Sequence, residues 1–288
     1  MNNTFYNLSY QDQLPIKRME LFVFLDPFCK DCLELDYILY RLTHEYGHYY
    51  KIRQILTFDL ERLNMCFSYR QNNDKKISRC CQVNRIKSKN NLIHSENLSN
   101  EPYYATLALK SAQFQGTKAG ARYLRSLINS YFLYHENISE LDVLEKCARE
   151  ARIDLKEFYN DLHSEAIISA IRSDFLLSKE MDITSIPSIV IFSSENEKEA
   201  IKISGIQSYE TYESVITKLL GKDINKGNIP NLQTIIDDFL FFTVYELSLL
   251  TGKSTNELDI ELKKLQLLQV IEKYTLPSGV YWRKKNCI

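Results

Sequence analysis

A short apolar run that leads directly into a pair of cysteines constrains the fold of this chain more than any other sequence feature. Residues 19–25, MELFVFL, are rich in β-forming side chains and carry one charge. Such a run is typical of a strand that is buried on both faces of an α/β sheet. Cys29 and Cys32 follow it, and apolar residues then recur at helical spacing. Together with an alternating stretch at residues 49–58, this predicts a β-α-β unit with Cys29 at the start of its helix.

A second group of elements begins at Pro187 and has the order strand, strand, helix. An Ile/Val-rich run follows Pro187, residues 199–205 predict another strand, and residues 208–220 predict an amphipathic helix. Four helices are predicted between the two groups, and residues 71–100 are polar and predict a loop. The helices run from Pro102 to Gly116, from Arg122 to Tyr134, from a cap at Ser139, and from the capping-box pair Asp154 and Glu157 into a long fourth helix.

This order of elements indicates an α/β chain with a thioredoxin-like domain of the DsbA type, in which a helical insertion separates the two groups. Residues 221–231, GKDINKGNIPN, are polar and contain two glycines and a proline, which is typical of a linker. The predicted organisation is an N-terminal tail at 1–18, a DsbA-like domain at 19–220 with its insertion at about 101–180, the linker at 221–231, and a small winged-helix-like module at 232–288.

The winged-helix prediction comes from the order of signals after the linker. Residues 232–242 are apolar at helical spacing, and two capping-box patterns follow, Thr243 with Glu246 and Ser254 with Glu257. Apolar and polar residues then alternate on both sides of a Pro-Ser-Gly turn, which predicts a hairpin. Helix, turn, helix, hairpin is the winged-helix order, and the hairpin would be the wing.

The charges of this module argue against binding to nucleic acid. Its second predicted helix begins STNELDIELKK, with three carboxylates in the opening turns, and these would repel phosphates. Residues 230–288 carry equal numbers of acidic and basic side chains: Asp237, Asp238, Glu246, Glu257, Asp259, Glu261 and Glu272 against Lys253, Lys263, Lys264, Lys273, Arg283, Lys284 and Lys285. The sequence therefore predicts a module that contacts protein.

The composition of the whole chain supports the same conclusion. Lys and Arg number 36 against 37 Asp and Glu, a formal charge of −1, which gives no general attraction to nucleic acid or anionic lipid. The N-terminal residues show no signal-peptide pattern, and the early apolar run is too short to cross a bilayer. The seven cysteines are therefore expected to be thiols in a reducing, cytoplasmic compartment.

Three interpretations of Cys29 and Cys32 remain open on the residues alone: a redox pair, a zinc clip, or a scaffold feature without chemistry. A cysteine at a helix N-terminus has its thiolate stabilised by unpaired N–H groups and the helix dipole, and Cys32 stands one turn later, where it can close a disulfide. Lys30 would add to that stabilisation and Asp31 would oppose it. Thioredoxins use a buried carboxylate six residues before the first cysteine, but this chain has Val23 there.

A zinc site would need two further ligands. Cys80 and Cys81 are adjacent, which is poor geometry for chelating one ion, and His44 and His48 share a helix face without a recognisable partner. The sequence predicts no metal and no cofactor.

Pro187 has a specific expected role. In thioredoxin-like folds a cis proline precedes the strand that faces the cysteines and leaves a backbone edge free to pair with an extended peptide. Pro187 has that position in order and context, so we expect a cis peptide bond there, with the Cys29 sulfur nearby.

Long strings of this sequence resemble the SpxH (YjbH) family of bacterial Firmicutes. The resemblance rests on EPYYATLALKSAQFQGTKAGARYLR, DLKEFYNDLHSEA, KEMDITSIPSIVIF and GIQSYETYESVITKLLG, and it runs from about Met19 almost to the C-terminal residue. It implies a cytosolic DsbA-like adapter that presents the transcription regulator Spx to the ClpXP protease. The family's Cys-x-x-Cys falls on Cys29 and Cys32, and its proline on Pro187. Some relatives begin with a His- and Cys-rich, zinc-associated segment, whereas NNTFYNLSYQDQ contains no His or Cys, so the resemblance does not by itself imply zinc-linked control here.

Two classes of function follow from these observations. The first is a non-enzymatic adapter with Spx and ClpX or ClpXP as partners, acting in the thiol stress response. The second is a cytosolic thiol-disulfide oxidoreductase that uses Cys29 and Cys32. The resemblance favours the adapter, in which the cysteine pair marks the ancestry of a binding scaffold and no residue is catalytic.

Overall fold

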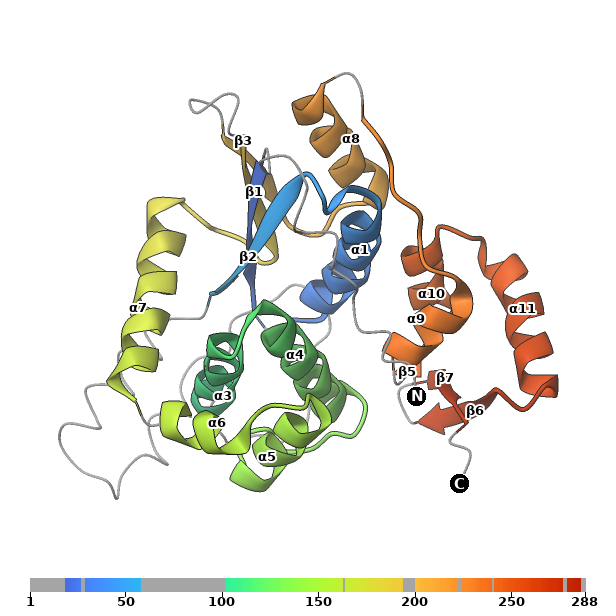
Figure 1. The fold of residues 1–288 in the computed structure, drawn as a ribbon, viewed down its shortest axis with the longest axis horizontal. Coiled ribbons are helices and arrows are strands. Elements are labelled where there is room, and N and C mark those ends of the chain that lie inside the picture. Colours follow the sequence, from blue (N-terminus) through green and yellow to red (C-terminus); the bar gives the residue numbers. More distant parts are fainter. Residues whose placement is uncertain are drawn as a thin grey trace. The chain divides into compact units, whose positions relative to one another are not determined.

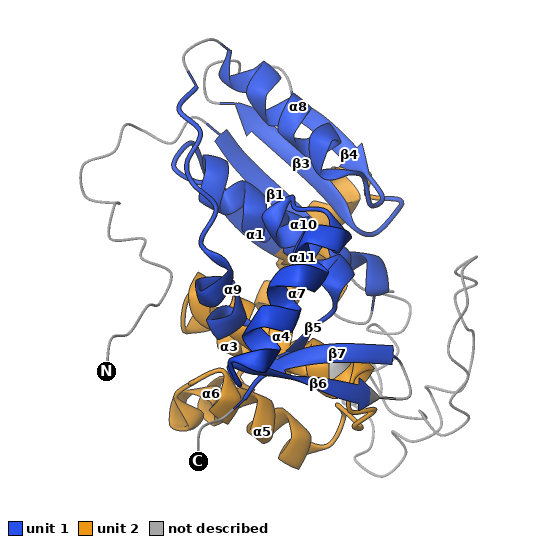
Figure 2. Ribbon diagram, turned by 90° about the vertical axis from the view of Figure 1, so that its right-hand side faces the viewer, with its two compact units in different colours: residues 1–24, 29–54, 184–288 blue, residues 25–28, 55–183 orange. Residues whose placement is uncertain are grey.

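The computed structural model describes most of the chain between residues 19 and 285, and two compact units can be distinguished in it. The described residues are 19–26, 29–57, 102–162, 164–193, 200–221, 224–239, 241–276 and 279–285. The sheet unit comprises residues 1–24, 29–54 and 184–288, and the helical unit comprises residues 25–28 and 55–183 (Figure 2). The predicted tail at 1–18, the predicted loop at 71–100 and the pair Cys80 and Cys81 lie outside the described residues.

The strands before and after the helical segment in the sequence form one four-stranded sheet (Figure 1). Its strands are β1 (Met19–Leu25), β2 (Tyr50–Leu56), β3 (Ser188–Ser193) and β4 (Ala200–Ser204), in the order β2-β1-β3-β4. Strand β3 is antiparallel to both neighbours, with Phe22 of β1 opposite Val190. Met19, Leu21 and Val23 are buried on one face of β1, whereas on the other face Glu20 and Phe22 are half-buried and only Phe24 is buried, so the predicted burial on both faces is confirmed only for the second half of the strand.

Two helices of the sheet unit lie side by side on the same face of the sheet. They are α1 (Lys30–Tyr46), which connects β1 to β2, and α8 (Tyr209–Leu220), which follows β4 (Figure 1). Ser208 begins α8 as predicted, because its hydroxyl accepts a hydrogen bond from the Thr211 N–H. Leu35, Ile38 and Leu42 form the buried stripe that the helical spacing of α1 predicts.

The C-terminal module consists of three helices and a small antiparallel sheet. Its elements are α9 (Leu232–Asp238), β5 (Phe241–Phe242), α10 (Val244–Thr251), α11 (Thr255–Leu267), β6 (Ile271–Leu276) and β7 (Gly279–Lys284), with strand order β5-β7-β6. Both predicted capping boxes are present, Thr243 with Glu246 and Ser254 with Glu257. The assignment of this module to the winged-helix class remains a prediction.

The prediction of one helix over residues 232–242 is wrong in its second half. Helix α9 ends at Asp238, and Phe239 is already extended, with φ −115° and ψ 121°. Phe241 and Phe242 then pair with Arg283 and Trp282 of β7. Phe242 becomes fully buried in this pairing, so packing with β7 outweighs the helical periodicity of the segment.

The C-terminal module shares its hydrophobic core with α1. Tyr37 and Tyr40 of α1 belong to the same buried cluster as Ile235, Ile236, Phe239, Phe242, Leu247, Leu250, Leu258, Leu262, Ile271 and Trp282. The rings of Tyr40 and Phe239 meet edge to face, with centroids 5.2 Å apart, and the Tyr40 hydroxyl donates a 2.8 Å hydrogen bond to Asp238. The outer side of the cysteine-bearing helix is thus covered by the module.

Residues 224–231, the described part of the predicted linker, are held against the end of α1. The Gly227 N–H donates to the Glu45 carbonyl at 2.8 Å, and the Asn225 N–H donates to the Tyr49 hydroxyl at 2.8 Å. A Cβ at position 227 would lie 2.4 Å from the His44 carbonyl oxygen, so only glycine permits this approach.

The helical unit contains five described helices where four were predicted. They are α3 (Pro102–Phe114), α4 (Thr117–Phe132), α5 (Leu141–Glu150), α6 (Leu155–Leu162) and α7 (Glu165–Glu180). The prediction of one long fourth helix is wrong. Helix α6 ends at Leu162, and Ser164 caps a new helix, α7, by accepting a hydrogen bond from the Ile167 N–H at 3.3 Å. Helix α4 starts before the predicted Arg122, and the N-cap of α5 is Glu140 where Ser139 was predicted.

A buried ion pair fixes α3 to α7 in this unit. Lys110 Nζ lies 2.5 Å from Asp174 Oδ2, which also accepts a hydrogen bond from the Leu56 N–H at 3.1 Å. Burial raises the pKa of Asp174, although the Lys110 charge works in the opposite direction. Within the described residues, no helix is long and apolar enough to span a bilayer.

Candidate functional site

The cysteine pair lies at the N-terminus of α1, against the residue before Pro187. Cys29 is the N-cap, in extended conformation, and Cys32 is buried in the first turn, where its N–H donates to the Cys29 carbonyl at 3.1 Å. The half-buried Cys29 thiol donates to the Ile186 carbonyl oxygen at 3.9 Å, and the Ile186–Pro187 peptide bond is cis. Both structural predictions for this site are therefore confirmed, whereas the roles of the three residues remain a prediction.

This arrangement contains the groups for thiol chemistry but lacks one that thioredoxins use. The position of Cys29 at the N-terminus of α1 lets the helix dipole favour a thiolate, although its side chain makes no capping hydrogen bond and its thiol donates to the Ile186 carbonyl. Val23, at the position of the buried carboxylate, is fully buried and pairs with Ile189 of β3. A valine side chain cannot accept or release a proton, so proton transfer during disulfide exchange would need another group.

The C-terminal module contacts the first turns of α1, directly after the cysteines. The Tyr245 hydroxyl donates to Glu34 Oε1 at 2.8 Å, and Glu246 interacts with Tyr37 and with the charge of Lys30. The pKa of Glu246 is raised overall, because the effect of burial exceeds the opposing effect of its capping hydrogen bonds. The start of α10 therefore lies beside the cysteine-bearing turn, a contact for which the sequence contains no motif.

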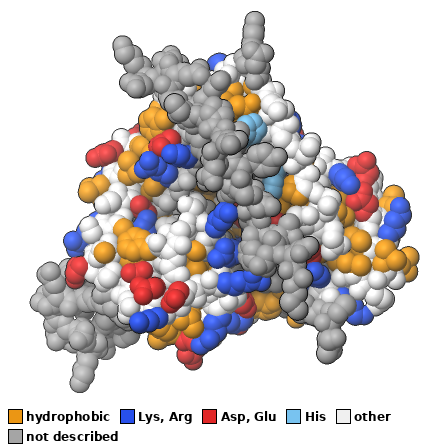
Figure 3. All heavy atoms as spheres, in the orientation of Figure 1, with side chains coloured by type: hydrophobic (Ala, Val, Ile, Leu, Met, Phe, Trp, Pro, Cys, Tyr) orange, Lys and Arg blue, Asp and Glu red, His pale blue; other side chains and the backbone are white. Residues whose placement is uncertain are grey.

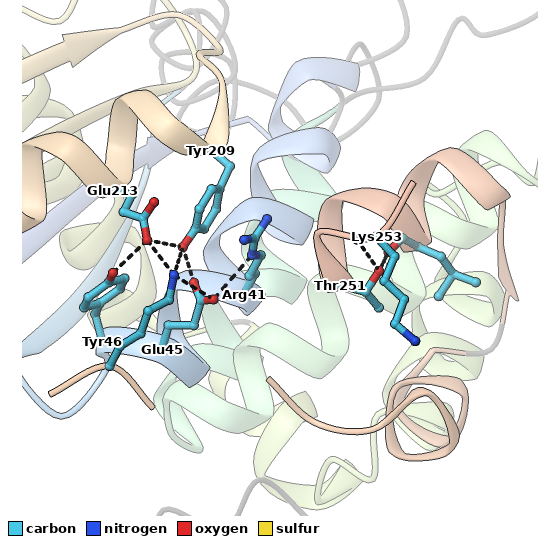
Figure 4. Close-up of polar contacts among 9 residues, drawn as sticks. Arg41, Glu45, Tyr46, Tyr209, Glu213, Thr251 and Lys253 are labelled. Atoms are coloured by element: carbon cyan, nitrogen blue, oxygen red, sulfur yellow. Dashed lines mark hydrogen bonds and ion pairs between the residues drawn. The ribbon is translucent and has the colours of Figure 1, made fainter. Parts of the chain in front are cut away.

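A second group of polar side chains joins the end of α1 to α8. Glu45 is only 2% exposed, and its carboxylate accepts a hydrogen bond from the Tyr209 hydroxyl. Arg41 lies over the Tyr209 ring, 3.5 Å from its centroid, and 3.6 Å from Glu45. The Tyr46 hydroxyl donates to Glu213 at 2.7 Å. Figure 4 shows these side chains pointing toward one another from the two helices.

Lys226 connects this cluster to the segment that leads into the C-terminal module. Its ammonium group lies 2.6 Å from Glu213 and 3.2 Å from Glu45. Burial alone would raise the pKa of Glu213, but hydrogen bonds from Lys226, Tyr46 and Tyr209 outweigh it and lower the pKa. Burial and Glu213 raise the pKa of Tyr46 to about 12. The cluster thus contains two carboxyl groups, Glu45 and Glu213, beside two basic side chains and two phenols that bond to one another across the two helices.

His44 and His48 pack against aromatic rings, but the prediction that they share a helix face is wrong, because α1 ends at Tyr46 and His48 follows its C-cap Gly47. His44 lies 4.6 Å from Tyr40 and His48 lies 3.9 Å from Tyr49, measured between ring centroids. Burial lowers the pKa of His44. Among the described residues, no three His, Cys, Asp or Glu side chains are grouped so that they could hold a metal ion.

Comparison with known proteins assigns the chain to a family. Residues 22–214 match the family model Thioredoxin. The ClpXP adapter protein SpxH of Bacillus licheniformis is 32% identical over 272 residues, which cover 94% of this chain and 90% of the relative. The ClpXP adapter proteins SpxH of Shouchella clausii and Bacillus subtilis are 33% and 31% identical over 94% and 93% of this chain. The chain belongs to the SpxH family.

Similarity to solved structures supports the thioredoxin-like fold of this SpxH family member. A protein described as a disulfide isomerase from Nitrosomonas europaea superposes with a TM-score of 0.52 and covers 70% of this chain and 98% of that chain. Its sequence is 14% identical, so this likeness shows the fold alone. The thioredoxin-like fold predicted from the order of elements is thereby confirmed.

The sequence revealed one of the two sites of this SpxH family member and missed the other. Cys29, Cys32 and Pro187 carry strong local signals, and the fold brings all three together. The cluster around Glu45 combines residues that are up to 185 positions apart along the chain, from Arg41 to Lys226. Tyr209 and Glu213, one helical turn apart on α8, were the only part of it that the sequence could have indicated.

Proposed function

We propose that this protein is an adapter that binds the transcription regulator Spx and promotes its degradation by the ClpXP protease, in the control of the thiol stress response. One observation carries the proposal. The similarity to the SpxH relatives covers at least nine-tenths of each chain in each of these pairs. It therefore includes the helical insertion and the C-terminal module as well as the thioredoxin-like elements.

The geometry supports an adapter because it offers firmly held surfaces of protein size. The C-terminal module is fixed to α1 by a shared core and by the cluster around Glu45 and Lys226. A fixed surface loses little freedom on binding, which favours a defined complex with a protein partner. In this proposal the partners are Spx and ClpX or ClpXP in the cytoplasm, without nucleic acid, membrane or cofactor.

Reconstituted proteolysis tests the proposal. Purified ClpXP is given Spx with and without the full chain, and the rate of Spx loss is followed. We expect the chain to accelerate the loss, and we expect the double variant Cys29→Ser/Cys32→Ser to do so equally well. A wild-type chain that leaves the rate unchanged at every ratio would refute the adapter.

A second candidate function is thiol-disulfide exchange, which the contact between Cys29 and Ile186 beside the cis Pro187 favours. The valine at position 23 argues for weak activity, because no carboxylate can handle the proton there. Insulin reduction measured beside an authentic thioredoxin decides between the two. We expect a turnover far below that of the thioredoxin. A turnover comparable to that of the thioredoxin, and lost in the double serine variant, would instead support the oxidoreductase function.

A further inference from the structure

One face of α11 carries exposed apolar side chains on either side of two lysines. Ile260, Leu267 and Leu268 are 56%, 82% and 72% exposed. Lys263 and Lys264 are also exposed and stand between them, three and four positions after Ile260. Positions i, i+3, i+4 and i+7 share one side of a helix, and Leu268 is the C-cap that directly follows α11. These five residues form a stripe, here called the α11 stripe.

The α11 stripe has no part in the core of the module. Leu258 and Leu262 form the opposite, fully buried face of α11 and belong to the core that surrounds Trp282. Single exposed apolar residues are common on protein surfaces, but a group on one face is typical of an interaction site. Figure 3 shows hydrophobic side chains together with charged ones at the edge of the molecule where α11 lies.

The charges of the module show what chemistry the α11 stripe would accept. Its other basic side chains all have partners within the described residues: Lys253 with Glu261, Arg283 with Glu272, Lys284 with Asp237, Lys285 with Gln269, and Lys273 over the Trp282 ring. Lys263 and Lys264 make no such contact with any described residue. Two positive charges that form no ion pair with a described residue therefore lie between apolar ends.

A complementary partner needs carboxylates flanked by apolar side chains. Ile260 and Leu267 are seven residues apart, or about 10 Å along the helix, so two turns of an amphipathic segment would span them. A nucleic acid carries a charge at every phosphate and would also meet Glu257, Asp259 and Glu261 in the first half of α11, whereas a short segment can place its carboxylates over Lys263 and Lys264 alone. We propose that the α11 stripe docks an acidic, apolar segment of Spx, an inference that rests on the proposed function.

Charge reversal in the full-length protein tests this surface. The variant Lys263→Glu/Lys264→Glu is compared with wild type in binding to fluorescently labelled Spx. The matched control is Lys156→Glu/Lys218→Glu, which changes two exposed lysines on α6 and α8 and alters the net charge equally. We expect the stripe variant to bind Spx about tenfold more weakly or worse, with a deficit that shrinks at high salt, and the control to bind nearly as wild type.

An apolar variant separates docking from general electrostatics. Ile260→Ser/Leu267→Ser removes the ends of the stripe without changing charge, and we expect a comparable loss of Spx binding that salt does not alter. Unchanged Trp282 fluorescence and circular dichroism would show that each variant is folded. Both stripe variants binding Spx as tightly as wild type does would overturn the inference.

The remaining outcomes identify what would be wrong. If wild type binds Spx and accelerates its degradation while the stripe variants do both equally well, the docking surface is refuted and the proposed function stands. If the stripe variants bind Spx normally but no longer accelerate degradation, the stripe contacts the protease, which contradicts docking of Spx. Binding of wild type to duplex DNA that the charge reversal abolishes would assign the stripe to nucleic acid. Failure of wild type to bind Spx at all would refute both proposals.

Discussion

Gly252, in the turn between α10 and α11, is expected to be essential for the contact between the C-terminal module and α1. Its φ is +70°, in the left-handed region, where an L-residue costs about 1–2 kcal/mol. A Cβ at this position would also lie 2.8 Å from Cζ of Arg41, so the guanidinium would have to move away. Arg41 stacks on Tyr209 at 3.5 Å, a cation–π contact worth about 1–2 kcal/mol when it is partly desolvated. Gly252→Ala should therefore lower the free energy of unfolding by about 2–4 kcal/mol.

Trp282 provides the assay. It is the single tryptophan of the chain and is 3% exposed in the core of the module, so its fluorescence reports on that module during urea unfolding. A double-mutant cycle with Arg41→Ala separates the two costs. In the Arg41→Ala background only the backbone cost remains, and Gly252→Ala should then cost about 1–2 kcal/mol.

Gly205→Ala is the matched control, because Gly205 has φ +72° and nothing within 4 Å of its added Cβ. Gly205→Ala should lower the free energy of unfolding, followed by circular dichroism, only by the cost of placing an L-residue at a positive φ. Equal costs for Gly252→Ala with and without Arg41, a coupling below about 0.5 kcal/mol, would refute the contact between this turn and α1.

Three further predictions concern the shared core, the cluster around Glu213 and the full chain. Phe239→Ala should lower the free energy of unfolding seen by Trp282 by about 3–5 kcal/mol, because the ring is 1% exposed, and a loss below about 1 kcal/mol would contradict the shared core. The pKa of Glu213 is lowered from 4.5 in the folded chain, so its contribution to stability is present above pH 4.5 and is lost as pH falls through the folded pKa. Acid titrations of the stability of wild type and Glu213→Gln should therefore differ in that window, and superimposable curves would contradict the cluster. The full chain should show no tight, salt-sensitive binding to duplex DNA in an anisotropy titration.

The sequence predicted those features that local chemistry determines. Thr243 and Ser254 accept hydrogen bonds from the N–H groups three residues later, and a capping box needs only four neighbouring residues. Cys29 and Pro187 were recognised because the order of elements in a thioredoxin-like fold places them together. In each case the prediction needed only a few neighbouring residues or the order of the helices and strands along the chain.

Contacts between distant segments could not be predicted in the same way. Tyr37 and Tyr40 extend the apolar surface of α1 beyond the stripe that faces the sheet, but periodicity does not say what covers them. Phe241 and Phe242 fit a helical pattern and became a strand because β7 was available for pairing. Glu45 meets Lys226 only because residues 224–231 return to α1. Tertiary packing decided each of these.

The central claim, that this SpxH family member works as an adapter, is tested most directly by degradation of Spx at fixed ClpXP over a wide range of adapter concentrations. An adapter holds client and protease together, so the rate of Spx degradation should rise and saturate as adapter is added. It should then fall, because excess adapter binds Spx without bringing it to the protease. Direct binding of Spx should be half-complete in the concentration range where the rate rises. A degradation rate that stays at its basal value at every ratio would contradict the account.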